Sequence, residues 1–428
     1  MRKFLAFLVA VFLACPAHAL SVINDTEVEK LLHKLITPVA TAAGVPQGRL
    51  KIHIVNSDDF NAFVTGGEDV FVYTGLLTRI KDTNALQAVV AHELGHMTGG
   101  HIAQMSARME AELKRTILMQ ALGVGLMVAG GNPSLGAGVL AGAGGVAQQS
   151  MLSFSRDEER MADDIAVDLL VKANINPNGL ITVFDQMQEN FGAAEAKINK
   201  NKTNHPLIGE RLQNTREKLK TVKHSSKYKT YPDGELELAR AKLVGYLYPE
   251  KQILAKYPYR DTTDAAVYAR SIGNMRGGAL DAARMGTLIL IKRNPKNPYY
   301  YELLGDIEYQ MGHYDASVDA YERALKLDTD APQIQTALAL VLSERKKPGD
   351  DTHGIELCKS SLLAVPAPLT YWVLSKLYND GRELWALAEF YNMNGDMKKA
   401  KKFATKAQKK LKPDTPEYIK AGDILEKE

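Results

Sequence analysis

His92-Glu93-Leu94-Gly95-His96 decides the fold of the first half of this chain. It lies within 84–104, where apolar residues recur at helical spacing. Residues four apart share one face of a helix, so the two histidines can bind one zinc ion through neutral imidazoles. Glu93 projects beside them and can take a proton from an attacking water and return it to a leaving amine. The motif therefore predicts a zinc hydrolase site on a helix.

A third metal ligand is available in a second helical segment, 156–173. Glu159 and Asp163 lie four residues apart there, and hence on one helix face. In zincins whose third ligand is glutamate, it comes from a second helix, and an aspartate one turn later hydrogen-bonds a ligand histidine. We expect one zinc ion per chain, bound by His92, His96 and Glu159. Asp163 is expected to hold the far ring nitrogen of a ligand histidine, His92.

These segments resemble the gluzincin metallopeptidase family that contains HtpX and the CAAX prenyl proteases. The resemblance rests on the histidine motif, on Ser155-Arg156-x-x-Glu159-x-x-Ala162-Asp163, and on 61–77, which is similar to the strand segment ahead of the zinc helix. It covers residues 24–217 in sequence and 235–428 in architecture only. The resemblance implies an endopeptidase. Its exported members with C-terminal repeats imply quality control of outer-membrane proteins.

Beyond residue 235 the sequence predicts a succession of helices, and its residue pattern repeats with a period close to 34 residues. Large, small and aromatic residues recur where tetratricopeptide repeats place them, in copies around Gly312 and Gly395. A degenerate copy around Gly277 precedes them. Each repeat buries one face on its neighbour, so the array is expected to form a platform that binds protein. An irregular helical bundle is the alternative.

The expected fold is mainly α with a small β-sheet, in an α+β arrangement. A zincin-type catalytic domain over 20–217 is followed by a linker at 218–234, which is basic, polar and interrupted by proline and glycine. An all-α repeat domain over 235–428 is expected to fold separately.

Two short strands, 61–64 and 70–73, are expected on either side of a tight Gly66-Gly67 turn. We expect the second to be an edge strand that pairs with an extended substrate backbone and presents its carbonyl to the zinc. Such recognition needs an unfolded or loosened substrate segment. The residues expected in this edge strand are Val70, Phe71, Val72 and Tyr73.

Two further histidines and an arginine are candidates around the site. His101, nine residues after His92, faces away from the ligands on an ideal helix and is interpreted as structural or surface. His205 precedes Pro206, and the family carries a similar His-Pro segment near its active site. Three interpretations stay open: a zinc contact from His205 in a latent state, an oxyanion contact from His205 or Arg211, or only a helix start.

Residues 1–19 are typical of a secretory signal peptide, with a basic start and an apolar run too short to span a bilayer. We expect cleavage after Ala19 and a periplasmic protein. The rival interpretation makes Cys15 a lipidated N-terminus, because Leu13-Ala14-Cys15 partly resembles a lipobox. Cleavage after Ala19 leaves Cys358 without a partner, which excludes an intramolecular disulfide.

The segment Thr116–Ser155 contains no charged residue. Three interpretations remain for 117–147: a lid over the active-site cleft, a contact with a membrane surface, or an ordinary core hairpin. The many glycines favour the first two slightly, since glycine is costly in helices that serve packing alone.

The formal net charge of +3 gives no indication of nucleic-acid binding. The sequence and the resemblance together predict an exported zinc endopeptidase that cleaves unfolded or misassembled envelope proteins. Its repeats would bind a partner, by resemblance an outer-membrane assembly complex, or deliver substrate. The alternative is a chaperone-like binding scaffold whose protease site is latent and gated.

Overall fold

The computed structural model describes residues 22–46, 48–65, 68–101, 103–104, 154–190, 208–222 and 228–427. The leader 1–19, the segment 117–147 and His205 lie outside the described residues. The chain divides into two compact units. The first is Met1–Asn24 with Glu29–Leu236, and the second is Asp25–Val28 with Glu237–Glu428.

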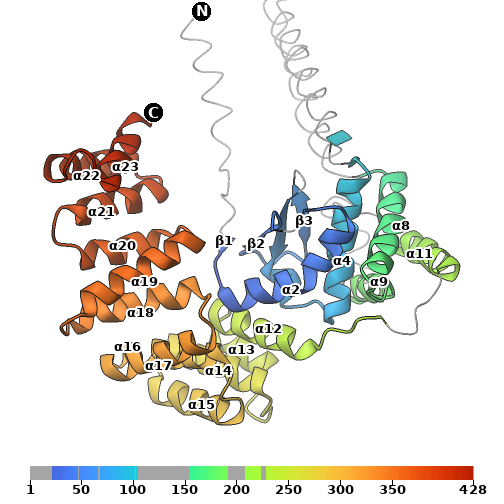
Figure 1. The fold of residues 1–428 in the computed structure, drawn as a ribbon. Coiled ribbons are helices and arrows are strands. Elements are labelled where there is room, and N and C mark those ends of the chain that lie inside the picture. Colours follow the sequence, from blue (N-terminus) through green and yellow to red (C-terminus); the bar gives the residue numbers. More distant parts are fainter. Residues whose placement is uncertain are drawn as a thin grey trace, which may run out of the picture. The chain divides into compact units, whose positions relative to one another are not determined.

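The first unit combines a small sheet with helices (Figure 1). Its strands are β1 (Val22–Ile23), β2 (Lys51–Val55), β3 (Ala62–Thr65) and β4 (Asp69–Tyr73). Its helices include α2 (Thr26–Ala42), α3 (Thr74–Leu77), α4 (Thr83–Thr98), α8 (Arg156–Lys172), α9 (Gly179–Asn190) and α11 (Ile208–Thr221). The expectation of a mainly α fold with a small sheet is confirmed.

The strand order β1-β2-β4-β3 corrects one expectation. β4 is not an edge strand, because it pairs in parallel with β2 and antiparallel with β3. Val72 thus lies opposite both Ile54 and Ala62. The Gly66-Gly67 turn predicts that β3 and β4 are neighbours, but it does not say which of the two also pairs with β2. In the described sheet the edge strand of this hairpin is β3.

Helix α4 is the buried centre of the first unit. The Asp82 carboxylate caps its start by accepting a hydrogen bond from the Ala85 N–H at 2.7 Å. Most of its residues are buried, and Gln87 donates to the Leu35 carbonyl of α2 at 2.9 Å. The helix ends at Thr98 rather than near 104, because Gly100 adopts a positive φ of +74°.

The second unit is a row of helices, each packed on its neighbours in the chain, such as α16 on α17 and α18 on α19. Its core falls into successive clusters along the chain, as expected for stacked repeats. The helices are α12 (Asp233–Leu247), α13 (Glu250–Lys256), α14 (Asp264–Arg276), α15 (Leu280–Arg293), α16 (Pro298–Gln310), α17 (Tyr314–Leu327), α18 (Pro332–Arg345), α19 (Asp350–Ala364), α20 (Pro368–Leu377), α21 (Arg382–Met393), α22 (Met397–Lys410) and α23 (Pro416–Glu426).

A buried cluster of charged groups surrounds Lys242 in the second unit. The Lys242 ammonium lies 2.9 Å from carboxylate oxygens of Asp25 and Glu302, and 3.4 Å from Glu27. The Tyr268 hydroxyl donates to Glu27 at 3.0 Å. Burial raises the pKa of both Glu27 and Glu302 to about 7, although Lys242 opposes the rise. A fragment of residues 235–428 would lack Asp25 and Glu27, so its separate folding stays a prediction.

Replacing Lys242 by methionine is expected to destabilise the second unit by about 3–5 kcal/mol at pH 8, because it leaves carboxylates buried without a counter-charge. The loss should be smaller at pH 5.5. Glu27 and Glu302 have folded-state pKa values of about 7, above the ordinary 4.5. The stability they contribute is therefore fully present below about pH 4.5 and is lost as the pH rises through 7. Urea unfolding followed by circular dichroism at both pH values measures the difference.

The matched control is Lys251→Met, at an exposed lysine of the neighbouring helix α13. Surface changes of this kind usually alter stability by less than about 0.5 kcal/mol. If the Lys242 and Lys251 variants unfold at the same urea concentration at pH 8, the Lys242 cluster does not stabilise this unit.

Candidate metal centre

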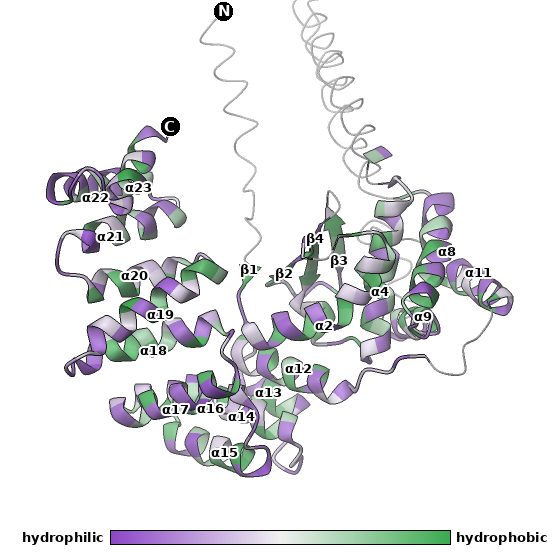
Figure 2. Ribbon diagram, viewed as in Figure 1, coloured by the Kyte–Doolittle hydropathy of each residue, from purple (hydrophilic) through white to green (hydrophobic). Residues whose placement is uncertain are grey.

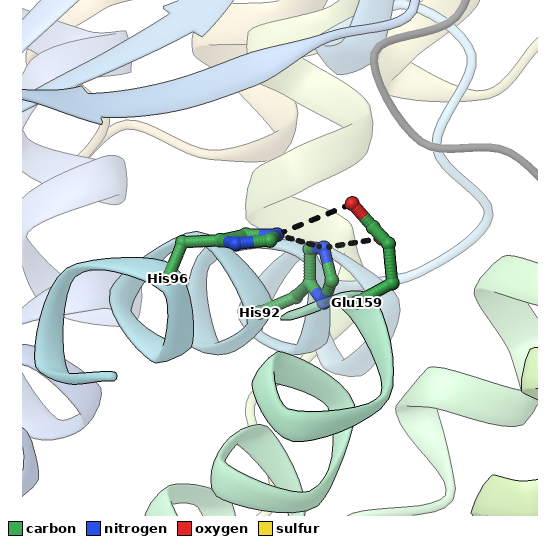
Figure 3. A group of neighbouring side chains, drawn as sticks. All are labelled: His92, His96 and Glu159. Carbon is green, nitrogen blue, oxygen red and sulfur yellow. Dashed lines mark hydrogen bonds and ion pairs between the residues drawn. The ribbon is translucent and has the colours of Figure 1, made fainter. Parts of the chain in front are cut away.

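Two helices bring the three expected metal ligands together (Figure 3). His92 and His96 lie one turn apart on α4, and Glu159 lies in the first turn of α8. The two histidine Nε2 atoms are 3.1 Å apart. His92 Nε2 is 3.6 Å from Glu159 Oε2, and His96 Nε2 is 3.5 Å from Glu159 Oε1. Ligand atoms about 2.1 Å from a tetrahedral zinc ion lie about 3.4 Å from one another, so this arrangement fits the ion.

The three side chains are buried, so the Glu159 carboxylate needs a compensating positive charge, to which both a metal ion and the Arg211 guanidinium can contribute. Two imidazole nitrogens and one carboxylate form a donor set that zinc prefers, and they leave one tetrahedral position for water or substrate. The chemistry of the donor set and its spacing therefore both fit a catalytic zinc site.

The sequence of α8 holds Glu159 at this place. Ser155 caps the helix, accepting a hydrogen bond from the Glu158 N–H at 3.2 Å, and Glu158 accepts one from the Ser155 N–H at 2.8 Å. Gly95 of the histidine motif lets α8 approach α4 closely. A Cβ atom at Gly95 would lie 2.6 Å from the Ala162 carbonyl oxygen, so any larger residue would push the third ligand away from the histidines.

Asp163 lies where the sequence places it, one turn beyond Glu159. Its Oδ1 is 2.9 Å from His92 Nδ1. Burial alone would raise the pKa of Asp163, but hydrogen bonds and charge from Arg211 hold it at about 2. An ionised Asp163 accepts the proton of His92 Nδ1, and this makes Nε2, on the side of Glu159, the ring nitrogen whose lone pair would bind a metal.

The sequence of this region matches that of a known peptidase family over 26–219. Residues 26–219 belong to peptidase family M48. A tetratricopeptide repeat profile matches 305–344 in the second unit. The metallopeptidase and repeat assignments expected from the motifs are both confirmed.

Some relatives match nearly the whole of this chain, and others match a shorter part of it. The beta-barrel assembly-enhancing protease of Escherichia coli K12 is 24% identical over 414 residues, which are 91% of this chain and 80% of the relative. A putative protease of the same name from Vibrio cholerae is 23% identical over 90% of this chain and 81% of its own. Metalloprotease LoiP of Escherichia coli K12 is 29% identical over 44% of this chain and 70% of its own.

Arg211, on α11 of the M48 domain, lies against the two carboxylates of the site. Its Nη1 is 2.8 Å from Glu159 Oε2, and its Nε and Nη2 each donate to Asp163 at 2.8 Å. The guanidinium also lies over the Phe184 ring, 5.0 Å from its centroid. This geometry favours a positioning role, in which Arg211 orients Glu159 and Asp163 and offsets their charge, over the oxyanion role left open by the sequence.

The structure corrects the interpretation of His101 as facing away from the ligands. Its Nδ1 lies 3.1 Å from Nδ1 of His96, and its side chain is buried. The helix ends at Thr98, and the positive φ of Gly100 turns the chain back toward His96. The ideal-helix extrapolation through this point was therefore wrong. The consecutive glycines 99 and 100 were the sequence signal that could have shown it.

A small, mainly apolar pocket opens beside His92 and Glu93. Ala62 of the edge strand β3 forms part of its wall, and Phe184 of α9 forms another part. Glu93 and His92 therefore both line a surface on which a substrate side chain can pack.

Proposed function

We propose that this protein is an exported zinc endopeptidase that cleaves unfolded or misassembled envelope proteins. The single observation that carries the proposal is the convergence of His92, His96 and Glu159 in an M48 domain, with Glu93 beside them. The long relatives named beta-barrel assembly-enhancing protease support the setting, because each spans both units of this chain.

The residues of the site divide the chemistry between them. His92, His96 and Glu159 would hold the zinc ion, which when bound polarises the scissile carbonyl and acidifies the attacking water. A Glu93 carboxylate oxygen accepts the proton of that water and returns it to the nitrogen of the leaving amine. Asp163 keeps His92 in the tautomer that donates from Nδ1, and Arg211 holds Asp163 and Glu159 in place.

We assign the substrate-binding edge to β3 in place of β4. The Tyr73 N–H donates to the Asn61 carbonyl at 3.1 Å, so these two residues form a hydrogen-bonded pair. Such pairs alternate along an antiparallel ladder, and the backbone groups of Ala62 and Val64 therefore point away from β4. They can pair with an extended peptide, which requires that the substrate be unfolded there.

Export and docking complete the proposal. Cleavage after Ala19 would release the protein to the periplasm, and the repeat unit would bind an outer-membrane assembly complex. Among the described helices, none combines the length and the apolar character needed to cross a bilayer. Gating by His205 lies outside the described residues.

Cleavage of unfolded casein before and after metal removal tests the proposal. The protein as purified is expected to cleave casein, to lose this activity on treatment with phenanthroline, and to regain it with about one equivalent of zinc. Undiminished cleavage by protein shown to be free of metal would contradict the zinc mechanism. A zinc-loaded protein that leaves casein intact would instead favour the latent scaffold.

A further inference from the structure

Helix α22 of the second unit carries a dense array of like charges. Seven of its 14 residues are lysine, and the chain contains no acidic residue between 397 and 413. The whole protein has a formal net charge of only +3, so this density is local. Other repeat helices carry mixed charges: α17 combines Asp315, Asp319 and Glu322 with Arg323 and Lys326.

The lysines gather on one side of the helix. Ala400, Ala404 and Ala407 are fully buried and fix the opposite side against the core of the unit. At 3.6 residues per turn, six of the lysines fall within an arc of about 120° on the exposed side. This lysine face consists of Lys398, Lys399, Lys402, Lys406, Lys409 and Lys410. Figure 2 shows hydrophilic residues along the length of α22.

Few carboxylates neutralise the lysine face. Lys399 pairs with Asp396 at 2.8 Å and Lys410 with Glu383 at 3.3 Å, both near an end of the helix. In the part of the chain that the structure describes, the remaining four lysines of the face have no acidic partner. These four are Lys398, Lys402, Lys406 and Lys409. Such a concentration of unpaired charge repels itself and favours an anionic partner.

We propose that the lysine face of α22 docks the protein on the surface of an anionic phospholipid bilayer. A straight helix of 14 residues presents its charges along a line of about 21 Å. Such a line can contact a flat anionic surface along its whole length, whereas a pocket would contact only part of it. Lysine ammonium groups on flexible stems act as point charges, and can follow headgroups that have no fixed positions.

The specific ion pairs of the same unit use both lysine, as in the Lys242 cluster, and arginine, whereas this face uses lysine alone. Elsewhere in the unit, arginines make defined pairs with carboxylates: Arg293 with Asp264 at 2.9 Å, and Arg345 with Asp350 at 2.7 Å. Helix α22 contains no arginine. The planar guanidinium of arginine binds the fixed carboxylates of a protein partner better than a lysine ammonium does, because it can form two parallel hydrogen bonds. The all-lysine composition of this face therefore favours a fluid anionic surface.

The packing of α22 determines how it can bind. Its apolar side is buried in the unit, so the helix cannot turn that side into the hydrocarbon of a membrane. The attraction is then purely electrostatic and acts within the Debye length, about 8 Å at physiological salt and about 3 Å at 1 M. Docking is therefore reversible and salt-dependent, and it does not require an active protease site.

Sedimentation of the full chain with vesicles tests the proposal. Vesicles of phosphatidylcholine with about one-third phosphatidylglycerol are expected to bind the protein in 50 mM salt, and binding should fall at least about 10-fold in 500 mM salt. Vesicles of phosphatidylcholine alone should not bind it. Replacing Lys398, Lys402, Lys406 and Lys409 together by glutamine should weaken binding at least about 10-fold, with an unchanged circular dichroism spectrum.

The matched control removes four exposed lysines from other repeat helices and loops, at Lys251, Lys292, Lys296 and Lys326. It changes the net charge equally and should retain binding. Three results would overturn the proposal: full binding by the α22 variant, which would place any membrane contact elsewhere, such as in 117–147; an equal loss in the control; or tighter binding of soluble polyglutamate than of the anionic vesicles, which would indicate an acidic protein partner.

Discussion

Glu93→Gln protein is expected to keep its metal and to lose casein cleavage by about 10²–10⁴-fold. Glutamine preserves the size and hydrogen-bonding capacity of the side chain, but it cannot accept a proton from the attacking water. Glu93 lies next to His92 on α4, and it is not among the three groups whose ligand atoms converge. The substitution therefore removes the base and leaves the metal ligands in place.

Initial rates of casein cleavage and the zinc content of the same preparations measure this prediction. The matched control is Glu217→Gln on the exposed surface of α11, where the carboxylate pairs with Lys220 at 2.7 Å and accepts a hydrogen bond from Gln213 at 3.2 Å. Such a surface pair contributes little, so the control should cleave at the normal rate. Near-normal turnover by the Glu93 variant would show that another group is the base.

The ligand set could be predicted from the sequence because it depends on helical spacing. His92 and His96 are four apart on one helix, and Glu159 and Asp163 are four apart on another, so each pair has a fixed local geometry. The structure brings both pairs together, and the two helices approach closely at Gly95. The roles of these residues in binding and catalysis remain proposals that the variants test.

The features that sequence reasoning missed depend on contacts between distant segments or on a break in periodicity. The edge strand is β3 and not β4, because β4 also pairs in parallel with β2. This pairing joins strands that are not consecutive in the chain, so no local pattern predicts it. The sequence had named Arg211 as a candidate near the site, but its contact with Asp163 spans 48 residues of chain, and no local pattern predicts it. Asp25 and Glu27 complete a cluster with Lys242 more than 200 residues away, which the expected boundary at 235 did not include.

The double variant His96→Ala, Glu159→Ala should be the most strongly affected of all in metal binding. It removes two of the three converging ligands, and His92 alone cannot hold a zinc ion against exchange with solvent. Cleavage of casein should fall at least as far as in the Glu93 variant, because without the ion the attacking water is neither bound nor acidified. Arg211 keeps its contacts with Asp163, so the helix packing around the site should largely survive.

The most direct test of a zinc centre at these residues is the zinc content per chain. It is measured by inductively coupled plasma mass spectrometry after dialysis against metal-free buffer. We predict about one zinc ion per chain in the unaltered protein and in Glu93→Gln, and almost none in the His96→Ala, Glu159→Ala double variant. Full zinc occupancy in the double variant would contradict the account, because the ion would then have to be bound somewhere other than this site.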